Sequence, residues 1–158
     1  MKSLFILFVP FTLLFSACKK SDSSAPGYIT ANTWQHDSVV YDANSSNRYT
    51  DSNNISIVFF PSGFWNVTPN IHFSFYKKLP KTEGVYNLTN SPTKADELGI
   101  QALEGAKGVY FGSQGSATCY VSIGANGKLT FRANNVPLSQ YGSSEKQTLN
   151  YSFNLTEF

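Results

Sequence analysis

Residues 149–156 read Leu-Asn-Tyr-Ser-Phe-Asn-Leu-Thr, an unbroken alternation of apolar and polar side chains. Successive side chains of a β-strand point to opposite faces, so this stretch predicts a strand with one face in a core and the other in water. A helix is not indicated, because its apolar side recurs every three or four residues. The positions that we expect to be buried are Leu149, Tyr151, Phe153 and Leu155.

The stretch before this strand, residues 118–133, predicts a β-hairpin. A three-residue loop makes one face of the hairpin uniformly apolar, whereas an even-length loop sets apolar side chains opposite polar ones. The three-residue loop also places Gly127 in a left-handed turn position, which only glycine adopts at little cost. The cross-strand pairs predicted by this loop are Ile123 with Leu129 and Val121 with Phe131.

Other apolar or alternating runs predict further strands, at 34–41, 55–60, 64–67, 71–76, 84–89 and 109–111. Residues 42–54 are rich in Asn, Ser and Asp and predict a long connection. Residues 93–104 fit either a capped helix or a short strand. Gly99 would cost a helix about 1 kcal/mol, and Leu98, Ile100 and Ala102 alternate, so the strand is favoured.

These segments predict a single all-β domain over residues 28–158. About nine short strands joined mostly by short turns favour an antiparallel β-sandwich. The alternative is a lipocalin-like β-barrel, because Trp34 at the opening of the first strand and the Pro61-Ser62-Gly63 turn resemble the start of that family.

The N-terminus predicts export. Residues 1–17 combine a positive start, an apolar run and two small residues, as in a secretory signal peptide. The run is shorter than the roughly 20 apolar residues that cross a bilayer, and Pro10 interrupts it. Phe15-Ser16-Ala17-Cys18 resembles the bacterial lipobox, which implies cleavage before Cys18 and attachment of lipid to its sulfur. The polar residues 18–27 predict a flexible tether.

Charge and cysteine usage narrow the possible partners. Removal of residues 1–17 takes Lys2 with it and leaves eleven basic against ten acidic residues, a net charge of +1. A charge this close to zero argues against nucleic acid as a partner.

Once Cys18 is acylated, Cys119 is the only cysteine that carries no lipid. Its alternate neighbours Val121 and Ile123 predict a buried, inert thiol rather than a catalytic one.

No catalytic or metal centre is predicted. His36 and His72 have no second ligand at close spacing, so no metal or other cofactor is expected, and exposed positions beside strands are predicted for both. Four carboxylates lie beside predicted turns, where solvation is the ordinary expectation: Glu83, Asp96, Glu97 and Glu104. An enzyme is therefore the least expected class of protein.

The best candidate for binding is an aromatic surface. In residues 71–76 the alternation puts His72 and Tyr76 on the face opposite the apolar one, and Trp65 could share that face. Flat rings with polar tips stack on sugar rings, although Trp65 also fits a core position. The sequence thus favours a binding or interaction module for a glycan or an envelope protein, with a purely structural or adhesin-like envelope component as the alternative.

The chain resembles the small lipoproteins of Bacteroidota. The features that carry the resemblance are Ser16-Ala17-Cys18-Lys19-Lys20, Gly84-Val85-Tyr86 and Asn126-Gly127-Lys128-Leu129. The resemblance implies a lipid-anchored outer-membrane protein with one β domain, and it leaves open whether the domain faces the periplasm or the cell surface. Asp37-Ser38-Val39 resembles the O-glycosylation signal of these bacteria, which implies modification of Ser38.

Overall fold

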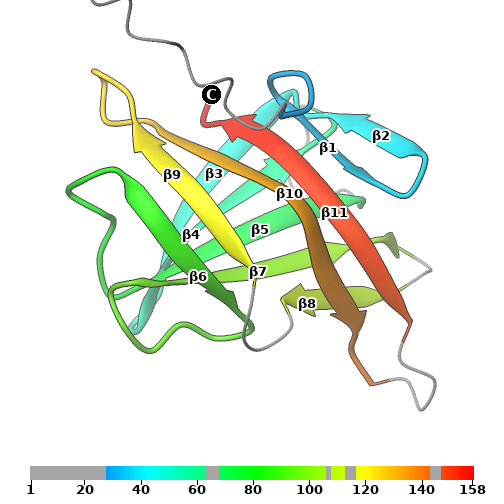
Figure 1. The fold of residues 1–158 in the computed structure, drawn as a ribbon. Coiled ribbons are helices and arrows are strands. Elements are labelled where there is room, and N and C mark those ends of the chain that lie inside the picture. Colours follow the sequence, from blue (N-terminus) through cyan, green and yellow to red (C-terminus); the bar gives the residue numbers. More distant parts are fainter. Residues whose placement is uncertain (1–27, 63–67, 106–107, 113–116, 143–146) are drawn as a thin grey trace, which may run out of the picture.

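The computed structural model describes residues 28–62, 68–105, 108–112, 117–142 and 147–158. Within these residues the chain forms eleven strands and no α-helix (Figure 1). The strands are β1 (Thr33–His36), β2 (Val39–Asp42), β3 (Ser45–Thr50), β4 (Asn54–Phe60), β5 (Asn70–Tyr76), β6 (Gly84–Thr89), β7 (Glu97–Leu103), β8 (Val109–Gly112), β9 (Thr118–Ile123), β10 (Leu129–Gln140) and β11 (Thr148–Thr156).

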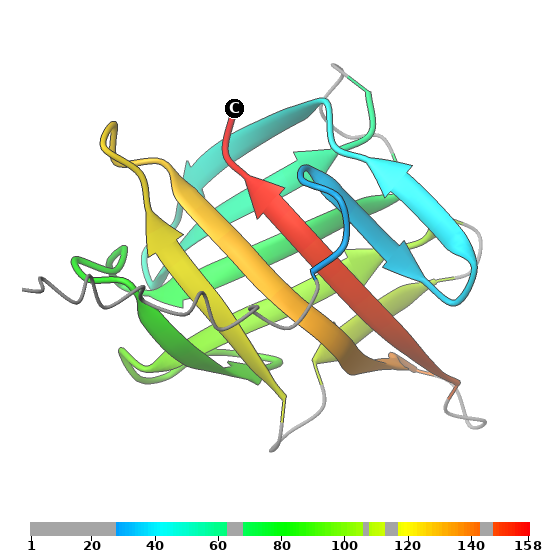
Figure 2. The same cartoon turned by 45° about the horizontal axis from the view of Figure 1, so that its top comes forward.

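All eleven strands belong to one sheet, in the order β2-β1-β11-β10-β9-β6-β7-β5-β4-β3, and β8 pairs with both β10 and β7. Only β6 and β7 run parallel. Figures 1 and 2 show that the sheet folds over on itself, so that β9, β10 and β11 cross the layer formed by β4, β5 and β7. The predicted all-β class is confirmed. The two facing layers are halves of one continuous sheet, and β6 lies at the corner because it pairs with β9 and β7.

Phenylalanine rings from both layers meet in the core. Phe73 of β5 stacks on Phe131 of β10 with a centroid distance of 4.3 Å and an interplanar angle of 9°, and Phe59 meets both rings edge-on. Each such pair adds about 0.5–1.5 kcal/mol beyond the burial of its surface. Because neighbouring side chains in a strand point opposite ways, His72 and Arg132 point outward on opposite sides of the domain.

The β9–β10 hairpin has the predicted register. Ile123 lies opposite Leu129, and Val121 lies opposite Phe131. Gly127 has a φ of 75°, the left-handed conformation that the three-residue loop requires. The prediction from the apolar face of this hairpin is therefore confirmed.

The last strand, β11, also follows its sequence pattern. It pairs with β10 on one side and with β1 on the other. Its four predicted core residues are all buried: Leu149, Tyr151, Phe153 and Leu155. A central strand with one face in the core is what the alternation indicated.

The prediction of one strand over residues 34–41 is wrong. Asp37 and Ser38 form a two-residue turn that separates β1 from β2, and the register pairs His36 with Val39. Asp37 has a φ of 51°, a left-handed conformation that Asp tolerates better than most residues. A hairpin turn of this kind needs only two residues, so it is easily hidden inside an extended run.

The predicted connection over residues 42–54 is also wrong, because it contains β3. This strand pairs along its whole length with β4, from Ser45 opposite Phe60 to Thr50 opposite Ile55. β3 ends the path of paired strands, and most of its side chains are exposed. An edge strand of this kind needs no apolar period, so its polar sequence resembles that of a loop. The predicted strand at 64–67 lies outside the described residues.

The favoured strand in residues 93–104 is confirmed as β7, with Leu98, Ile100 and Ala102 buried. Only glycine fits at position 99, because neighbouring side chains leave no space for a Cβ atom. A Cβ at this position would collide with the Ser74 hydroxyl and lie 2.9 Å from Cδ of Pro92.

An ion pair joins the end of the chain to the edge strand β3. Arg48 donates through Nη2 to both carboxylate oxygens of Glu157, at 2.6 and 2.8 Å. Glu157 Oε2 also accepts from the backbone N of Leu129 at 2.7 Å. Because Glu157 is buried and fully bonded, this group ties β3 to β10 and to the end of β11.

Candidate functional site

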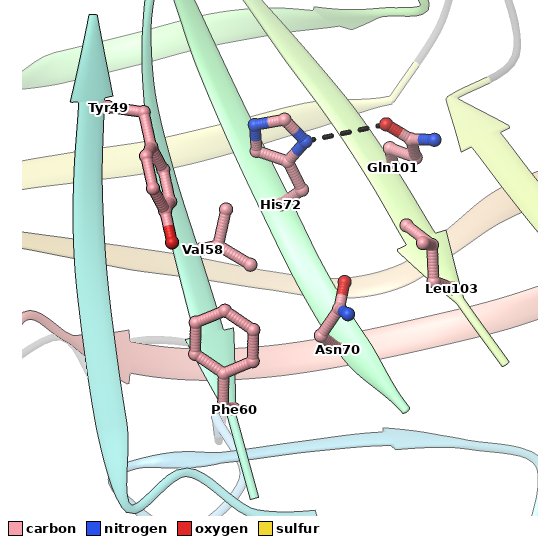
Figure 3. Close-up of a pocket in the computed structure, with 7 residues that line it drawn as sticks. All are labelled: Tyr49, Val58, Phe60, Asn70, His72, Gln101 and Leu103. Atoms are coloured by element: carbon pink, nitrogen blue, oxygen red, sulfur yellow. Dashed lines mark hydrogen bonds between the residues drawn. The ribbon is translucent and has the colours of Figure 1, made fainter. Parts of the chain in front are cut away.

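The outer face of β3, β4, β5 and β7 carries a pocket of about 330 Å³, which we call the His72 pocket (Figure 3). Two neighbouring cross-strand rows form its floor. One row contains Val58, His72 and Gln101, and Asn70 and Leu103 lie opposite each other in the next. The described residues that line it are Tyr49, Val58, Phe60, Asn70, His72, Gln101 and Leu103.

The imidazole of His72 is the most distinctive group in this pocket. Its Nδ1 lies 3.4 Å from the side-chain oxygen of Gln101, so Nδ1 carries the hydrogen and donates it to that oxygen. Nε2 is then a hydrogen-bond acceptor. It is buried and has no partner among the described residues. A buried acceptor without a donor costs free energy that a bound hydroxyl can recover.

Burial also fixes the charge state of this histidine. Desolvation lowers the pKa of His72 below its ordinary value of 6.5, and the hydrogen bond with Gln101 only partly opposes the shift. The ring is therefore neutral at and above neutral pH. None of the described residues that line the pocket is Lys, Arg, Asp or Glu. The site is suited to an uncharged ligand that has both apolar and hydroxyl surfaces.

The walls combine apolar and aromatic groups. The ring of Tyr49 stands along the β3 side, and the ring of Phe60 lies at the Asn70 end (Figure 3). Tyr49 is 44% exposed although it is large and aromatic, which leaves its face available for stacking. Pockets that bind small ligands share this build of apolar walls with a few polar groups, and about 300 Å³ is at the small end of their range.

Of the three predicted ligand-face residues, one lines the pocket, one lies beside it on the same face, and one is outside the described residues. His72 and Tyr76 share the outer face of β5, as predicted. Tyr76 lies outside the lining of the pocket, and the Lys77 ammonium lies 4.9 Å from its ring centroid. Trp65 is outside the described residues.

Most of the pocket was not found from the sequence. Tyr49 comes from a segment predicted to be a loop, and Gln101 comes from a segment whose structure was ambiguous. The signal that could have found Gln101 is strand register, because it lies directly opposite His72. His72 and Gln101 are 29 residues apart in the sequence. The register that pairs their two strands cannot be derived from either strand alone.

A second polar group lies inside the domain, and it corrects two predictions. His36 and Glu104 were expected to be exposed, but both are buried, and their side chains are each 2% exposed. Nε2 of His36 lies 3.2 Å from Oε2 of Glu104. β1 directs His36 inward like Trp34, and Glu104 directly follows the buried strand β7.

Two tyrosines complete this group, which we call the buried cluster. Tyr151 donates to Oε1 of Glu104 at 2.9 Å, and Tyr41 donates to Oε2 at 3.2 Å. Burial, then the Glu104 charge, raises the pKa of both tyrosines, so their hydroxyls stay protonated and act as donors. Glu104 thus accepts two hydrogen bonds from tyrosine hydroxyls and lies within 3.2 Å of the His36 imidazole, which is how a protein holds a buried carboxylate.

The buried cluster is built for stability rather than for ligand binding. Three of its four members are almost inaccessible to water: His36, Glu104 and Tyr151. Nδ1 of His36 faces the Asp37 carboxylate at 3.7 Å. In the parts of the chain that the structure describes, no three His, Cys, Asp or Glu side chains are placed to hold a metal ion.

The other residues singled out from the sequence lie outside both the pocket and the buried cluster or outside the described residues. Cys119 is completely buried, as predicted, and burial raises its pKa well above the ordinary value, which favours an inert thiol. Ser38 is exposed in the β1–β2 turn. Cys18 lies outside the described residues. Among the described residues no helix has the length and apolar character needed to span a bilayer.

Comparison with known proteins gives no assignment. No family model, no curated protein and no solved structure matches this chain.

Proposed function

We propose that this protein is a lipoprotein of the cell envelope that binds an uncharged sugar in the His72 pocket. In this proposal acylated Cys18 anchors the chain to the outer membrane, and residues 18–27 connect the anchor to the β domain. The protein acts by binding and not by catalysis. The observation that carries the proposal is the pocket itself: its described lining contains no charged side chain, and its central imidazole holds a buried acceptor without a described donor.

The lining matches the surface of a sugar. A pyranose ring has apolar C–H faces, which stack on aromatic side chains such as Tyr49 and Phe60. Its hydroxyls are both donors and acceptors. One hydroxyl would donate to Nε2 of His72 and thereby give that atom the partner it lacks, once the side chains that cover Nε2 in the free protein move aside. The volume of about 330 Å³ fits a single sugar unit.

The anchor has its support in the N-terminal sequence. Phe15-Ser16-Ala17-Cys18 supplies two small residues before a thiol, and the preceding apolar run is of signal-peptide length. Each buried methylene adds about 0.8 kcal/mol, so two or three acyl chains hold a protein to a membrane almost permanently. Labelling cells with a clickable palmitate analogue tests this part. A protein that keeps Cys18 but takes up no label would disprove the anchor.

The sugar part is tested with the mature, acylated protein in detergent micelles on a glycan array. Binding to neutral glycans that His72→Phe weakens about tenfold, equivalent to about 1.4 kcal/mol, would support the pocket. Phenylalanine keeps a flat ring in place and removes the acceptor nitrogen. Tyr76→Phe is the matched control, because Tyr76 shares the outer face of β5 but does not line the pocket.

Two results would contradict the proposal. Equal losses in His72→Phe and Tyr76→Phe would mean that binding uses the general sheet surface rather than the pocket. Failure to bind any glycan, together with one envelope protein that co-purifies reproducibly, would instead favour a structural or partner-binding role.

A further inference from the structure

A second pocket, of about 250 Å³, lies on the outer face of β6, β9 and β10, where the described chain begins. Val85, Tyr120 and Arg132 stand side by side across these three strands, since Val85 lies opposite Tyr120 and Tyr120 lies opposite Arg132. Tyr28, the first described residue, also lines the pocket. We call this surface, made by Tyr28, Val85, Tyr120 and Arg132, the tether face.

The tether face is held in a fixed arrangement. Arg132 Nε donates to the side-chain oxygen of Asn154 at 3.2 Å, and the Asn154 amide donates to the backbone oxygen of Ile29 at 3.1 Å. These bonds place the start of the domain beside the guanidinium group. None of the ion pairs in the described part of the chain includes Arg132. Its charge is therefore available to an external anion.

The apolar groups of this face are unusually exposed. Val85, at the β6 end of the row, is 65% exposed. Burial and the neighbouring Glu83 carboxylate both raise the pKa of Tyr120, so its hydroxyl stays protonated at neutral pH. Tyrosine, arginine and an exposed valine together form the composition that is favoured at the boundary between lipid and water.

The length of the tether limits how far this face can lie from the lipid. Ten residue steps separate Cys18 from Tyr28, and a chain extends by at most about 3.6 Å per residue, so the reach is at most about 36 Å. A flexible chain of this length has a typical end-to-end distance of only about 20 Å. An anchor at Cys18 therefore holds Tyr28, and the residues around it, near the membrane.

We propose that the tether face rests on the phospholipid headgroups of the membrane that holds the acylated Cys18, an inference that depends on the proposed anchor. Arg132 pairs with a lipid phosphate, and Tyr28, Tyr120 and Val85 lie in the headgroup layer. The contact is a second attachment beside the lipid, and it fixes the orientation of the domain.

That orientation would turn the sugar pocket away from the bilayer. Phe73 and Phe131 stack on each other between the two layers. Their neighbours His72 and Arg132 point outward from opposite layers. With Arg132 on the headgroups, the His72 pocket faces the surrounding solution and is open to ligands.

The test uses full-length acylated protein inserted into preformed vesicles of phosphatidylethanolamine and phosphatidylglycerol. A fraction of the lipid carries a nitroxide on its headgroup, which quenches nearby fluorophores. Val85→Cys receives a thiol-reactive fluorophore on the tether face. Asn47→Cys is the matched control, because Asn47 is exposed on the outer face of β3, in the row of Val58 and His72. Cys119 is buried and Cys18 is acylated, so the introduced cysteine takes the label.

We expect a loss of emission for Val85→Cys on insertion and no loss for Asn47→Cys. Adding Arg132→Gln to the Val85→Cys protein should reduce the loss, with the thermal midpoint as the check on folding. Equal quenching at the two positions, in protein shown to carry palmitate label, would overturn the membrane contact and leave the anchor standing. Absence of palmitate label would overturn the anchor and the membrane contact together.

Discussion

The two histidines of this chain occupy opposite kinds of environment. His36 lies inside the domain against a carboxylate, near the hydroxyl of Tyr41 and the ring of Tyr151. His72 lies on the outer face, where one ring nitrogen meets Gln101 and the other meets no described partner. Each imidazole has one buried nitrogen without a hydrogen-bond partner among the described residues, Nδ1 in His36 and Nε2 in His72. The contrast lies in position: His36 is enclosed in the domain with Glu104, whereas His72 lines a pocket on the outer face. The four predictions below test this difference, from the largest effect to the smallest.

The largest effect is expected for Glu104→Ala. This change leaves His36, Tyr41 and Tyr151 without their common acceptor inside the domain. Each buried polar group left without a partner costs about 1–3 kcal/mol, so the whole change should cost about 3–5 kcal/mol. Urea unfolding followed by circular dichroism measures the loss. Glu83→Ala is the control, because Glu83 is an exposed carboxylate and its removal should cost less than about 0.5 kcal/mol. Similar losses for the two variants would show that the cluster does not stabilise the fold.

The matched pair His36→Phe and His72→Phe compares the two sites directly. His36→Phe removes a charge-assisted donor from buried Glu104 and should cost about 1.5–3 kcal/mol. His72→Phe should change the unfolding free energy by less than about 0.5 kcal/mol, because only a weak bond to Gln101 is lost. Unfolding curves of both variants under one set of conditions provide the comparison. A larger loss for His72→Phe would reverse the roles assigned to the two histidines.

Patterns within one segment account for what the sequence predicted correctly. The alternation in β11, the apolar face of the β9–β10 hairpin and the left-handed Gly127 are local properties, and each has its predicted form. The two errors in the N-terminal half have local causes too. Asp37 and Ser38 form a turn too short to interrupt the pattern of the run, and β3 is an edge strand whose polar side chains resemble a loop.

The two polar sites depend on contacts that no local pattern contains. His36 and Glu104 are 68 residues apart, and only the pairing of β1 with β11 and the path of β7 bring them together. Glu104 directly follows a buried strand, beside Gly105, so it resembled a solvated turn residue. The His72 pocket likewise needs the register of four strands, from Tyr49 in β3 to Leu103 in β7. The sequence could single out His72 but not its neighbours.

A smaller effect is expected for Tyr151→Phe. The hydroxyl of Tyr151 donates to Oε1 of Glu104 at 2.9 Å inside the core. Its removal leaves the ring in place and takes away one of the three polar groups that surround the carboxylate, at a cost of about 1–2 kcal/mol. Tyr49→Phe, at the pocket wall, should leave stability unchanged within about 0.5 kcal/mol. Unfolding midpoints and slopes in urea check both values. No loss in Tyr151→Phe would show that the other two groups suffice for Glu104.

The smallest effect is the dependence of stability on pH that His72 contributes. Burial lowers the pKa of His72 in the folded state below 6.5, the value expected in the unfolded chain. Between these two pKa values the unfolded chain binds more protons, so the contribution of His72 to stability falls as the pH drops below 6.5 and levels off below the folded pKa. Above 6.5 the ring is neutral in both states and contributes no slope. The unfolding free energy of the wild type minus that of His72→Phe, measured at several pH values, isolates this contribution from those of the other titratable groups.

Sugar binding should weaken over the lower part of the same pH range, because a protonated Nε2 no longer accepts a hydrogen bond. A difference that grows as the pH drops would mean that protonation is favoured in the pocket, and the ligand would then have to be an anion.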